Sequence, residues 1–223
     1  EWWPFSRRNA GRFRPEYAVC QRYKAATMIT LYILWIVWCV LHSVLITVRF
    51  QQWIRTQRKV WSAVYRLSYV CFSLCSLLLL MIYTASQPQR PLSIPPWVQV
   101  AQALLFLYAL IMFIGGARVY DLKIFLGIRQ WQDFRAGRDS PAPLFLTTGI
   151  LCYVRHPWYS GGLALLWAVP GLTDLTLLTR TILSGYLIIG TFLEERKLKQ
   201  IFGEPYQTYC QQVPLLIPWR LCH

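Results

Sequence analysis

The sequence contains few charged residues and lacks the motifs of common soluble enzymes. Charged residues make up 14% of its 223 positions and hydrophobic residues 56%. It has neither a GxGxxG turn nor a Walker sequence, so nothing supports a soluble dinucleotide-binding fold or a P-loop. The seven cysteines form no CxxC pair and have no metal-ligand spacing with the three histidines. We therefore expect neither a metal site nor a disulfide.

Acidic residues are also few, since 9 Asp and Glu stand against 23 Lys and Arg, giving a net charge of +14. Most basic residues lie in the links after the first and third apolar runs and in the carboxyl-terminal tail, whereas the other links hold only Arg90 and, nearby, Arg180. This is the positive-inside pattern of membrane proteins. Basic loops beside anionic lipid explain the charge, so we expect the lipid bilayer, and no nucleic acid, as a partner.

Long apolar runs are what the sequence has in abundance. They cover Met28–Val48, Leu67–Tyr83, Trp97–Val119 and Trp158–Leu193, the last interrupted at Pro170-Gly171. A crossing takes roughly 20 helical residues, so each of the first three suffices, and the fourth is long enough for a helical hairpin. The first arm of that hairpin, Trp158 to Val169, is short, and we expect it to be tilted, re-entrant or continued past the proline. The prediction is an all-α membrane protein with about five transmembrane helices.

Residues 1 to 27 disagree with this pattern. They are basic, yet an odd number of crossings places them outside, and Met28 opens the first apolar run. We expect residues 1–27 to be an extension outside the working fold, and residues 28–223 to form a single membrane domain.

A polar cluster lies where the last apolar run begins. Because proline disfavours a helical conformation in the preceding residue, His156 should be extended and Pro157 should start a helix. The free amides of that helix start, with Arg155 and His156 beside them, predict a site for a carboxylate or phosphate. Gly161-Gly162 would let a flat ligand or another helix approach closely. Alternatively, Arg155 contacts lipid phosphate and the glycines only pack.

A second polar cluster lies where the same run ends. A carboxylate at the hydrocarbon boundary needs a cation, and Glu194 and Glu195 both lie there. Arg196, Lys197 and Lys199 would supply one in a surface network. In the functional interpretation, one Glu faces a cytoplasmic pocket and binds a cationic ligand. An anion site beside a cation site suits a zwitterion that carries a sulfonium.

Further polar residues lie near the cytoplasmic ends of the first two runs. His42 is costly in a membrane helix unless it is paired or faces a cavity. It is therefore either satisfied by a neighbouring helix or part of a substrate pocket. Tyr65, Arg66 and Tyr69 share one helical face, where they would serve as interfacial anchors or contact the substrate.

The order and spacing of these residues resemble a known superfamily. Arg155-His156-Pro157-x-Tyr159-x-Gly161, Glu194-Glu195-x-x-Leu198 and Phe202-Gly203-x-x-Tyr206-x-x-Tyr209 are similar to the carboxyl half of the integral-membrane methyltransferases. That superfamily includes isoprenylcysteine carboxyl methyltransferases and phospholipid N-methyltransferases. The resemblance covers about residues 145–220. Leu41-His42-Ser43 and Tyr65-Arg66 resemble the NnrU-like branch, which includes bacterial methanethiol S-methyltransferases.

The resemblance implies that S-adenosylmethionine binds in a pocket on the cytoplasmic side of a bacterial inner membrane. The contacts it implies, together with neighbouring signature residues, are Thr148, Gly149, Ile150, Leu151, Arg155, His156, Pro157, Tyr159, Gly162, Glu194 and Glu195. The acceptor would enter from the membrane near His42, Tyr65 and Arg66, which we take as the candidate catalytic residues. Since a thiol must lose its proton on attack, His42 is the expected base.

Several acceptors and two other functions stay open. A small thiol such as methanethiol suits the short loops, but a prenylcysteine carboxylate or a phospholipid amine could enter between helices. The same signature resembles the NADPH-binding half of sterol reductases, which have about twice as many spans. A membrane accessory protein without enzymatic activity is the remaining alternative.

Overall fold

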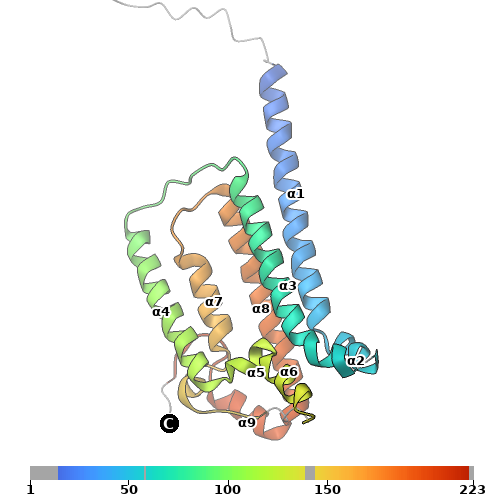
Figure 1. The fold of residues 1–223 in the computed structure, drawn as a ribbon. Helices are drawn as coiled ribbons and strands as arrows, with labels where there is room; N and C mark the ends of the chain where they lie inside the picture. The colour runs from blue at the N-terminus through green and yellow to red at the C-terminus, as the bar shows by residue number, and fades with distance from the viewer. Residues whose placement is uncertain (1–14, 58, 139–143, 221–223) are drawn as a thin grey trace, which may run out of the picture.

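The computed structural model describes residues 15–57, 59–138 and 144–220, and it is helical with no strand in those ranges (Figure 1). The helices are α1 (Pro15–Ile46), α2 (Val48–Gln57), α3 (Lys59–Ser86), α4 (Trp97–Val119), α5 (Leu122–Leu126), α6 (Ile128–Arg135), the 3-10 helix η2 (Gly149–Cys152), α7 (Pro157–Ala168), α8 (Asp174–Phe202) and α9 (Glu204–Gln212). The prediction of an all-α protein is confirmed for these residues.

Four of these helices are long and apolar enough to cross a membrane. The candidate spans are Ala25–Ile46, Val60–Ser86, Trp97–Val119 and Asp174–Phe202. Large apolar side chains point outward from them, and Leu79, Leu104 and Ile189 are each more than 60% exposed. Such a surface is stable when lipid, rather than water, surrounds it. The membrane class expected from composition is therefore confirmed.

The first arm of the expected hairpin is the short helix α7. Its 12 residues reach about 18 Å, less than a hydrocarbon core requires. The chain continues beyond it as a non-helical segment that meets the link after α3. There the Leu92 amide donates to the Leu172 carbonyl at 2.9 Å, and the Asp174 amide donates to the Arg90 carbonyl at 3.2 Å.

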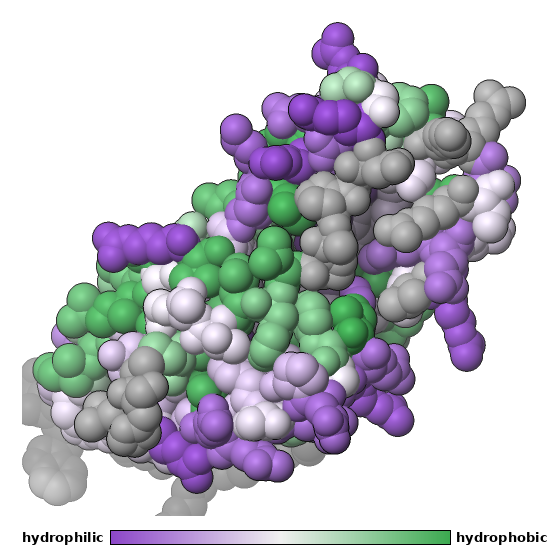
Figure 2. Space-filling model, turned by 90° about the horizontal axis from the view of Figure 1, so that it is seen from below, coloured by the Kyte–Doolittle hydropathy of each residue, from purple (hydrophilic) through white to green (hydrophobic). Residues whose placement is uncertain are grey.

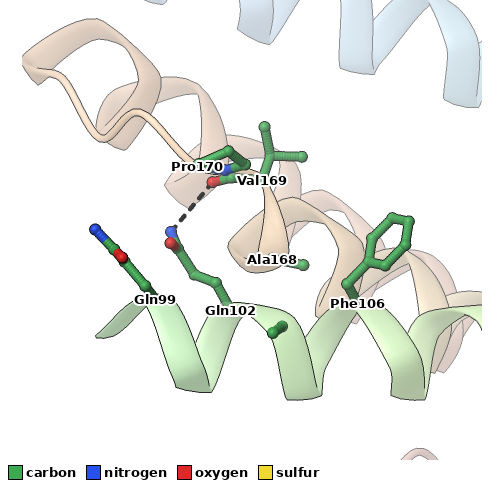
Figure 3. A pocket seen from close by; sticks show the side chains of 7 residues that line it. Gln99, Gln102, Phe106, Ala168, Val169 and Pro170 are labelled. Carbon is green, nitrogen blue, oxygen red and sulfur yellow. Dashed lines mark hydrogen bonds between the residues drawn. The ribbon is translucent and has the colours of Figure 1, made fainter. Parts of the chain in front are cut away.

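Two polar side chains satisfy the backbone where α7 ends. The Val169 carbonyl accepts from Arg180 Nη2 at 2.8 Å and from Gln102 Nε2 at 3.2 Å, the latter drawn in Figure 3. An unsatisfied carbonyl in hydrocarbon costs several kcal/mol, so these donors make the break in the helix tolerable. A groove of about 420 Å³ opens beside them, between Gln102 and Phe106 of α4 and the end of α7. It lies at the opposite end of α7 from the polar clusters around Arg155 and Glu195.

The other end of the bundle is covered by short helices. α5, α6 and α9 lie beneath α3, α4, α7 and α8, and α2 projects to one side (Figure 1). Gly127 between α5 and α6 has φ 86°, and a Cβ on it would come within 2.6 Å of the Leu67 amide nitrogen. The link after α4 is thus pressed against α3. Figure 2 shows this end, where hydrophilic residues surround a hydrophobic centre.

The cysteines correct one expectation. Cys39, Cys71, Cys75 and Cys210 are free, whereas Cys152 is disulfide-bonded. The prediction of no disulfide is wrong at Cys152, because spacing along the chain does not show which sulfurs meet in the fold. Within the described ranges, no group of three or more His, Cys, Asp or Glu residues could hold a metal ion.

Candidate active site

Glu195 of α8 is the centre of the polar network at this end of the bundle. Its carboxylate forms a two-pronged ion pair with Arg155, from Nε to Oε1 and from Nη2 to Oε2, each at 3.0 Å. His156 Nε2 lies 3.2 Å from Oε1, and the Tyr206 hydroxyl donates to the same oxygen at 2.7 Å. Glu195 is only 6% exposed. The expected link between the two polar clusters therefore forms inside the protein.

The groups around this carboxylate are held in a fixed charge state by their surroundings. Burial raises the pKa of Tyr206 well above its usual range, and the neighbouring Glu195 carboxylate raises it further. Burial also raises the pKa of the Cys210 thiol, whose Sγ lies 3.7 Å from Glu195 Oε2. Tyr206 therefore remains a hydrogen-bond donor and Cys210 a neutral thiol. Lys199, at 3.8 Å, completes the surroundings of Glu195 from the surface.

Arg155 also ties the carboxyl-terminal tail to the start of α7. Its Nη1 donates to the Cys210 carbonyl at 2.7 Å. Its backbone amide donates to the Pro214 carbonyl at 2.9 Å, and the His156 amide donates to the Leu215 carbonyl at 3.2 Å. As expected, His156 is non-helical and Pro157 is the first residue of α7. Arg155 thus forms its ion pair with Glu195.

Glu194 faces a different group of side chains. Successive helical residues point about 100° apart, so Glu194 lies outside the Glu195 network. It is half-buried and interacts with the hydroxyl groups of Tyr159 and Tyr120. Burial raises the pKa of Tyr120 to about 12, and the negative charge of Glu194 contributes to the rise. Glu194 is therefore a carboxylate lined by neutral tyrosines.

The segment Thr148 to Leu151 lies against the end of α4. Gly149 has φ 63°, and a Cβ there would come within 2.9 Å of a Val119 methyl group. Ile150 packs on Gly115, while Leu151 is buried and its carbonyl accepts from the Tyr209 hydroxyl. Thr148 and Gly149 are exposed. The structure thus gives this segment a defined position beside α4.

The two glycines of α7 contact helices in this structure. A Cβ on Gly161 would lie 3.0 Å from Met112 Cβ of α4, and one on Gly162 would lie 3.3 Å from a Leu187 methyl group of α8. Of the two possibilities that the sequence left open, the contact shown here is close helix approach. Any contact of Gly162 with a ligand stays a prediction.

His42 lies in an aromatic cluster formed by α1, α3 and α8. Its Nε2 is 2.6 Å from the Tyr69 hydroxyl oxygen. The ring stacks on Trp38 with centroids 5.0 Å apart and lies edge-on to Tyr186 at 5.8 Å. Nδ1 is buried and has no hydrogen-bond partner in the described part of the chain. His42 is therefore paired with a neighbouring helix, and it also keeps one free nitrogen.

Tyr65 and Arg66 connect helices rather than join this cluster directly. The Tyr65 hydroxyl donates to the Leu45 carbonyl near the end of α1. Arg66 Nε donates to the Phe125 carbonyl at 2.9 Å, and its guanidinium lies 5.4 Å from the Phe125 ring centroid. Both residues therefore fasten α3 to its neighbours, and their interfacial anchoring and their contact with a substrate stay predictions.

Sequence reasoning did not predict the contacts that three tyrosines make in the site. Tyr206 belongs to the motif Phe202-Gly203-x-x-Tyr206-x-x-Tyr209. Its spacing along the chain from Glu195 was the available signal for a contact between the two residues. Tyr69 shares a helical face with Tyr65, which placed it near the site but did not pair it with His42. Tyr186 lies inside an apolar run, where no sequence signal distinguishes it from a packing residue.

The fold and the site define a helical membrane protein whose polar side chains lie where α1 and α8 end and where α3 and α7 begin. The NnrU protein family matches residues 28–207, and the chain belongs to this family. Methanethiol S-methyltransferase 1 of Bradyrhizobium diazoefficiens is 32% identical over 185 residues, which cover 80% of this chain and 62% of that protein. The chain therefore spans less than two thirds of the length of that relative.

Two further relatives carry the same activity in their names. Methanethiol S-methyltransferase of Pseudomonas sp. is 30% identical over 186 residues, covering 80% of this chain and 68% of that protein. Methanethiol S-methyltransferase of Mycobacterium tuberculosis is 27% identical over 205 residues, covering 92% of this chain and 83% of that protein. No solved structure matches the chain.

Proposed function

We propose that the protein transfers a methyl group from S-adenosylmethionine to a small thiol, with methanethiol as the best candidate. Relatives named for this reaction align with about 80% of the chain. Within the structure, the proposal is carried by the different surroundings of two adjacent acids, Glu194 and Glu195. The Glu195 carboxylate contacts Arg155, His156 and Lys199. Glu194 is left facing Tyr159 and Tyr120, and is free to meet a cation.

The residues present fit the proposed methyl donor. When bound, S-adenosylmethionine supplies a methyl group on a positively charged sulfur. A carboxylate and aromatic rings are the groups that stabilise such a cation in a partly dry site. We assign Glu194 and Tyr159 as direct contacts. Arg155, His156 and Glu195 then position α7, α8 and the tail, and Thr148 to Leu151 would form an adjacent wall with Pro157 and Gly162 behind it.

The acceptor side follows from the aromatic cluster. Its rings give a small apolar thiol a pocket of matching polarity, with His42 as the group that takes the thiol proton. Tyr65 and Arg66 would shape the entrance by holding α3. We place this site on the cytoplasmic side of a bacterial inner membrane, with α7 and its extended continuation as a fifth crossing beside the four long helices.

Direct binding measurements test the methyl donor. Radiolabelled S-adenosylmethionine should bind the full chain in lipid nanodiscs. Glu194→Gln should weaken binding about 10- to 100-fold, the worth of one charged hydrogen bond. Glu204→Gln, at the exposed start of α9, is the matched control and should bind normally. Binding of NADPH instead would point to a reductase, and binding of neither ligand to an accessory protein.

Transfer assays identify the acceptor. Methanethiol, a prenylcysteine and an aminophospholipid should be offered in parallel, with the volatile, prenyl and lipid products measured separately. Methylation of methanethiol alone is the expected result. Methylation of the prenylcysteine or the lipid, with methanethiol left unchanged, would contradict the acceptor assignment but leave the donor intact.

A further inference from the structure

Tyr69 lies between the two halves of the proposed site. On one side its hydroxyl oxygen is 2.6 Å from His42 Nε2, with the two ring centroids 5.1 Å apart. On the other side it interacts electrostatically with Tyr159, which itself interacts with Glu194. Tyr69 is only 7% exposed. His42 is thus hydrogen-bonded to Tyr69, and Tyr69 and Glu194 each interact electrostatically with Tyr159.

His42 itself is shielded on several sides. Trp38 stacks on its ring, Tyr186 lies against its edge, and Nδ1 is buried. The remaining nitrogen, Nε2, is occupied by the Tyr69 hydroxyl. Because the Tyr69 hydroxyl contacts Nε2 and Nδ1 is buried, a thiol would exchange a proton with His42 through the Tyr69 oxygen.

We propose that Tyr69 is the residue that contacts the acceptor thiol and passes its proton to His42. This inference rests on the proposed function. As the thiol sulfur attacks the methyl carbon, its S–H bond breaks and an S–CH₃ bond forms. The thiol proton goes to the Tyr69 oxygen, and the original Tyr69 proton goes to His42 Nε2. The methyl group leaves the donor sulfur, which keeps the electron pair and becomes a neutral thioether.

The relay requires a particular tautomer of His42, and this can be tested without any ligand. Nε2 must accept from Tyr69, so neutral His42 must carry its proton on Nδ1. Nitrogen-15 NMR of histidine-labelled protein in lipid should show an unprotonated, hydrogen-bonded Nε2, with the resonance identified by its loss in His42→Gln. Tyr69→Phe should shift it to the position of a free nitrogen. A protonated Nε2 in the unsubstituted protein would overturn the relay.

Two thiols of equal chain length and different acidity provide the kinetic test. Ethanethiol is largely protonated at neutral pH, whereas trifluoroethanethiol is much more ionised and has less need of a base. With ethanethiol, Tyr69→Phe should lower kcat about 100-fold or more, the usual worth of general-base catalysis. With trifluoroethanethiol the loss should be less than about tenfold. Tyr83→Phe, on the exposed face of the same helix, is the matched control and should be unchanged with both thiols.

The outcomes separate this inference from the proposed function. If the unsubstituted protein methylates neither thiol, the proposed function fails and the relay fails with it. If the unsubstituted protein methylates both thiols, the proposed function stands. The relay alone is then overturned if Tyr69→Phe loses activity equally with both thiols, or loses it with neither. A variant that carries both Tyr69→Phe and His42→Gln should be no slower than the slower of the two single variants, because Tyr69 and His42 act as a unit.

Discussion

Glu195 holds together three segments, namely the start of α7, the end of α8 and the tail. Its replacement with Gln keeps the shape but leaves the buried Arg155 without its counter-charge. Removing one partner of a buried ion pair typically costs about 3 to 5 kcal/mol. Glu195→Gln should therefore lower the thermal unfolding midpoint in nanodiscs markedly, and Glu204→Gln should not. Equal midpoints for the two variants would contradict the structural role of Glu195.

The same pair of acids shows what sequence can and cannot predict at the scale of a residue. Two adjacent Glu residues at the end of an apolar run predicted a polar site correctly. Which of them turns inward depends on where α7 and α9 pack around α8, because adjacent helical positions differ by about 100° in direction. That packing involves Arg155 and Tyr206, which lie 40 and 11 residues away along the chain from Glu195.

At the scale of elements, α4 and α7 pack through glycine. A Cβ on Gly116 would lie 2.2 Å from Trp158 Nε1 and 2.6 Å from Cδ1. Trp158 has little freedom to move away, since Tyr120 and Phe125 hold its ring with centroids 5.0 and 4.5 Å distant. Gly116→Ala should therefore destabilise the protein by about 1 to 3 kcal/mol, the usual cost of overpacking, measured by thermal unfolding.

Gly185 of α8 provides the matched control for Gly116. A Cβ on Gly185 would meet nothing within 4 Å. Since alanine favours helix over glycine by up to about 1 kcal/mol, Gly185→Ala should leave stability unchanged or raise it slightly. A Gly116→Ala variant as stable as Gly185→Ala would show that α4 and α7 are further apart than described.

The elements were predictable to the extent that hydrophobic length defines them. The three long runs before residue 120 became α1, α3 and α4 with similar carboxyl ends, because a helix that faces lipid must stay apolar throughout. α1 and α3 begin well before their apolar runs, at Pro15 and Lys59, because a helix can continue beyond its apolar part. α7 was harder to place, since its helix ends at Ala168 and a non-helical segment follows it. The donors that permit this, Gln102 and Arg180, belong to other helices and have no local signature.

At the scale of the whole molecule, charge and connectivity together predict an orientation. The end that holds α5, α6 and α9 carries most of the described basic side chains outside the spans, whereas the link after α3 carries Arg90. Basic loops stay in the cytoplasm because their translocation is disfavoured. The same end holds Glu194, His42 and Tyr69. The orientation therefore decides whether the proposed site can reach a cytoplasmic methyl donor.

Cysteine accessibility in intact bacterial cells tests this orientation. Ser93→Cys places a thiol in the link after α3, and Gln207→Cys places one on the exposed face of α9. A membrane-impermeant maleimide should label Ser93→Cys in intact cells, and Gln207→Cys only after permeabilisation, with the unsubstituted protein giving the background from its own cysteines. Labelling of Gln207→Cys from outside would reverse the orientation. It would also separate the proposed site from the cytoplasmic supply of S-adenosylmethionine, so that the methyl-transfer proposal would fail in the cell even if binding were observed in nanodiscs.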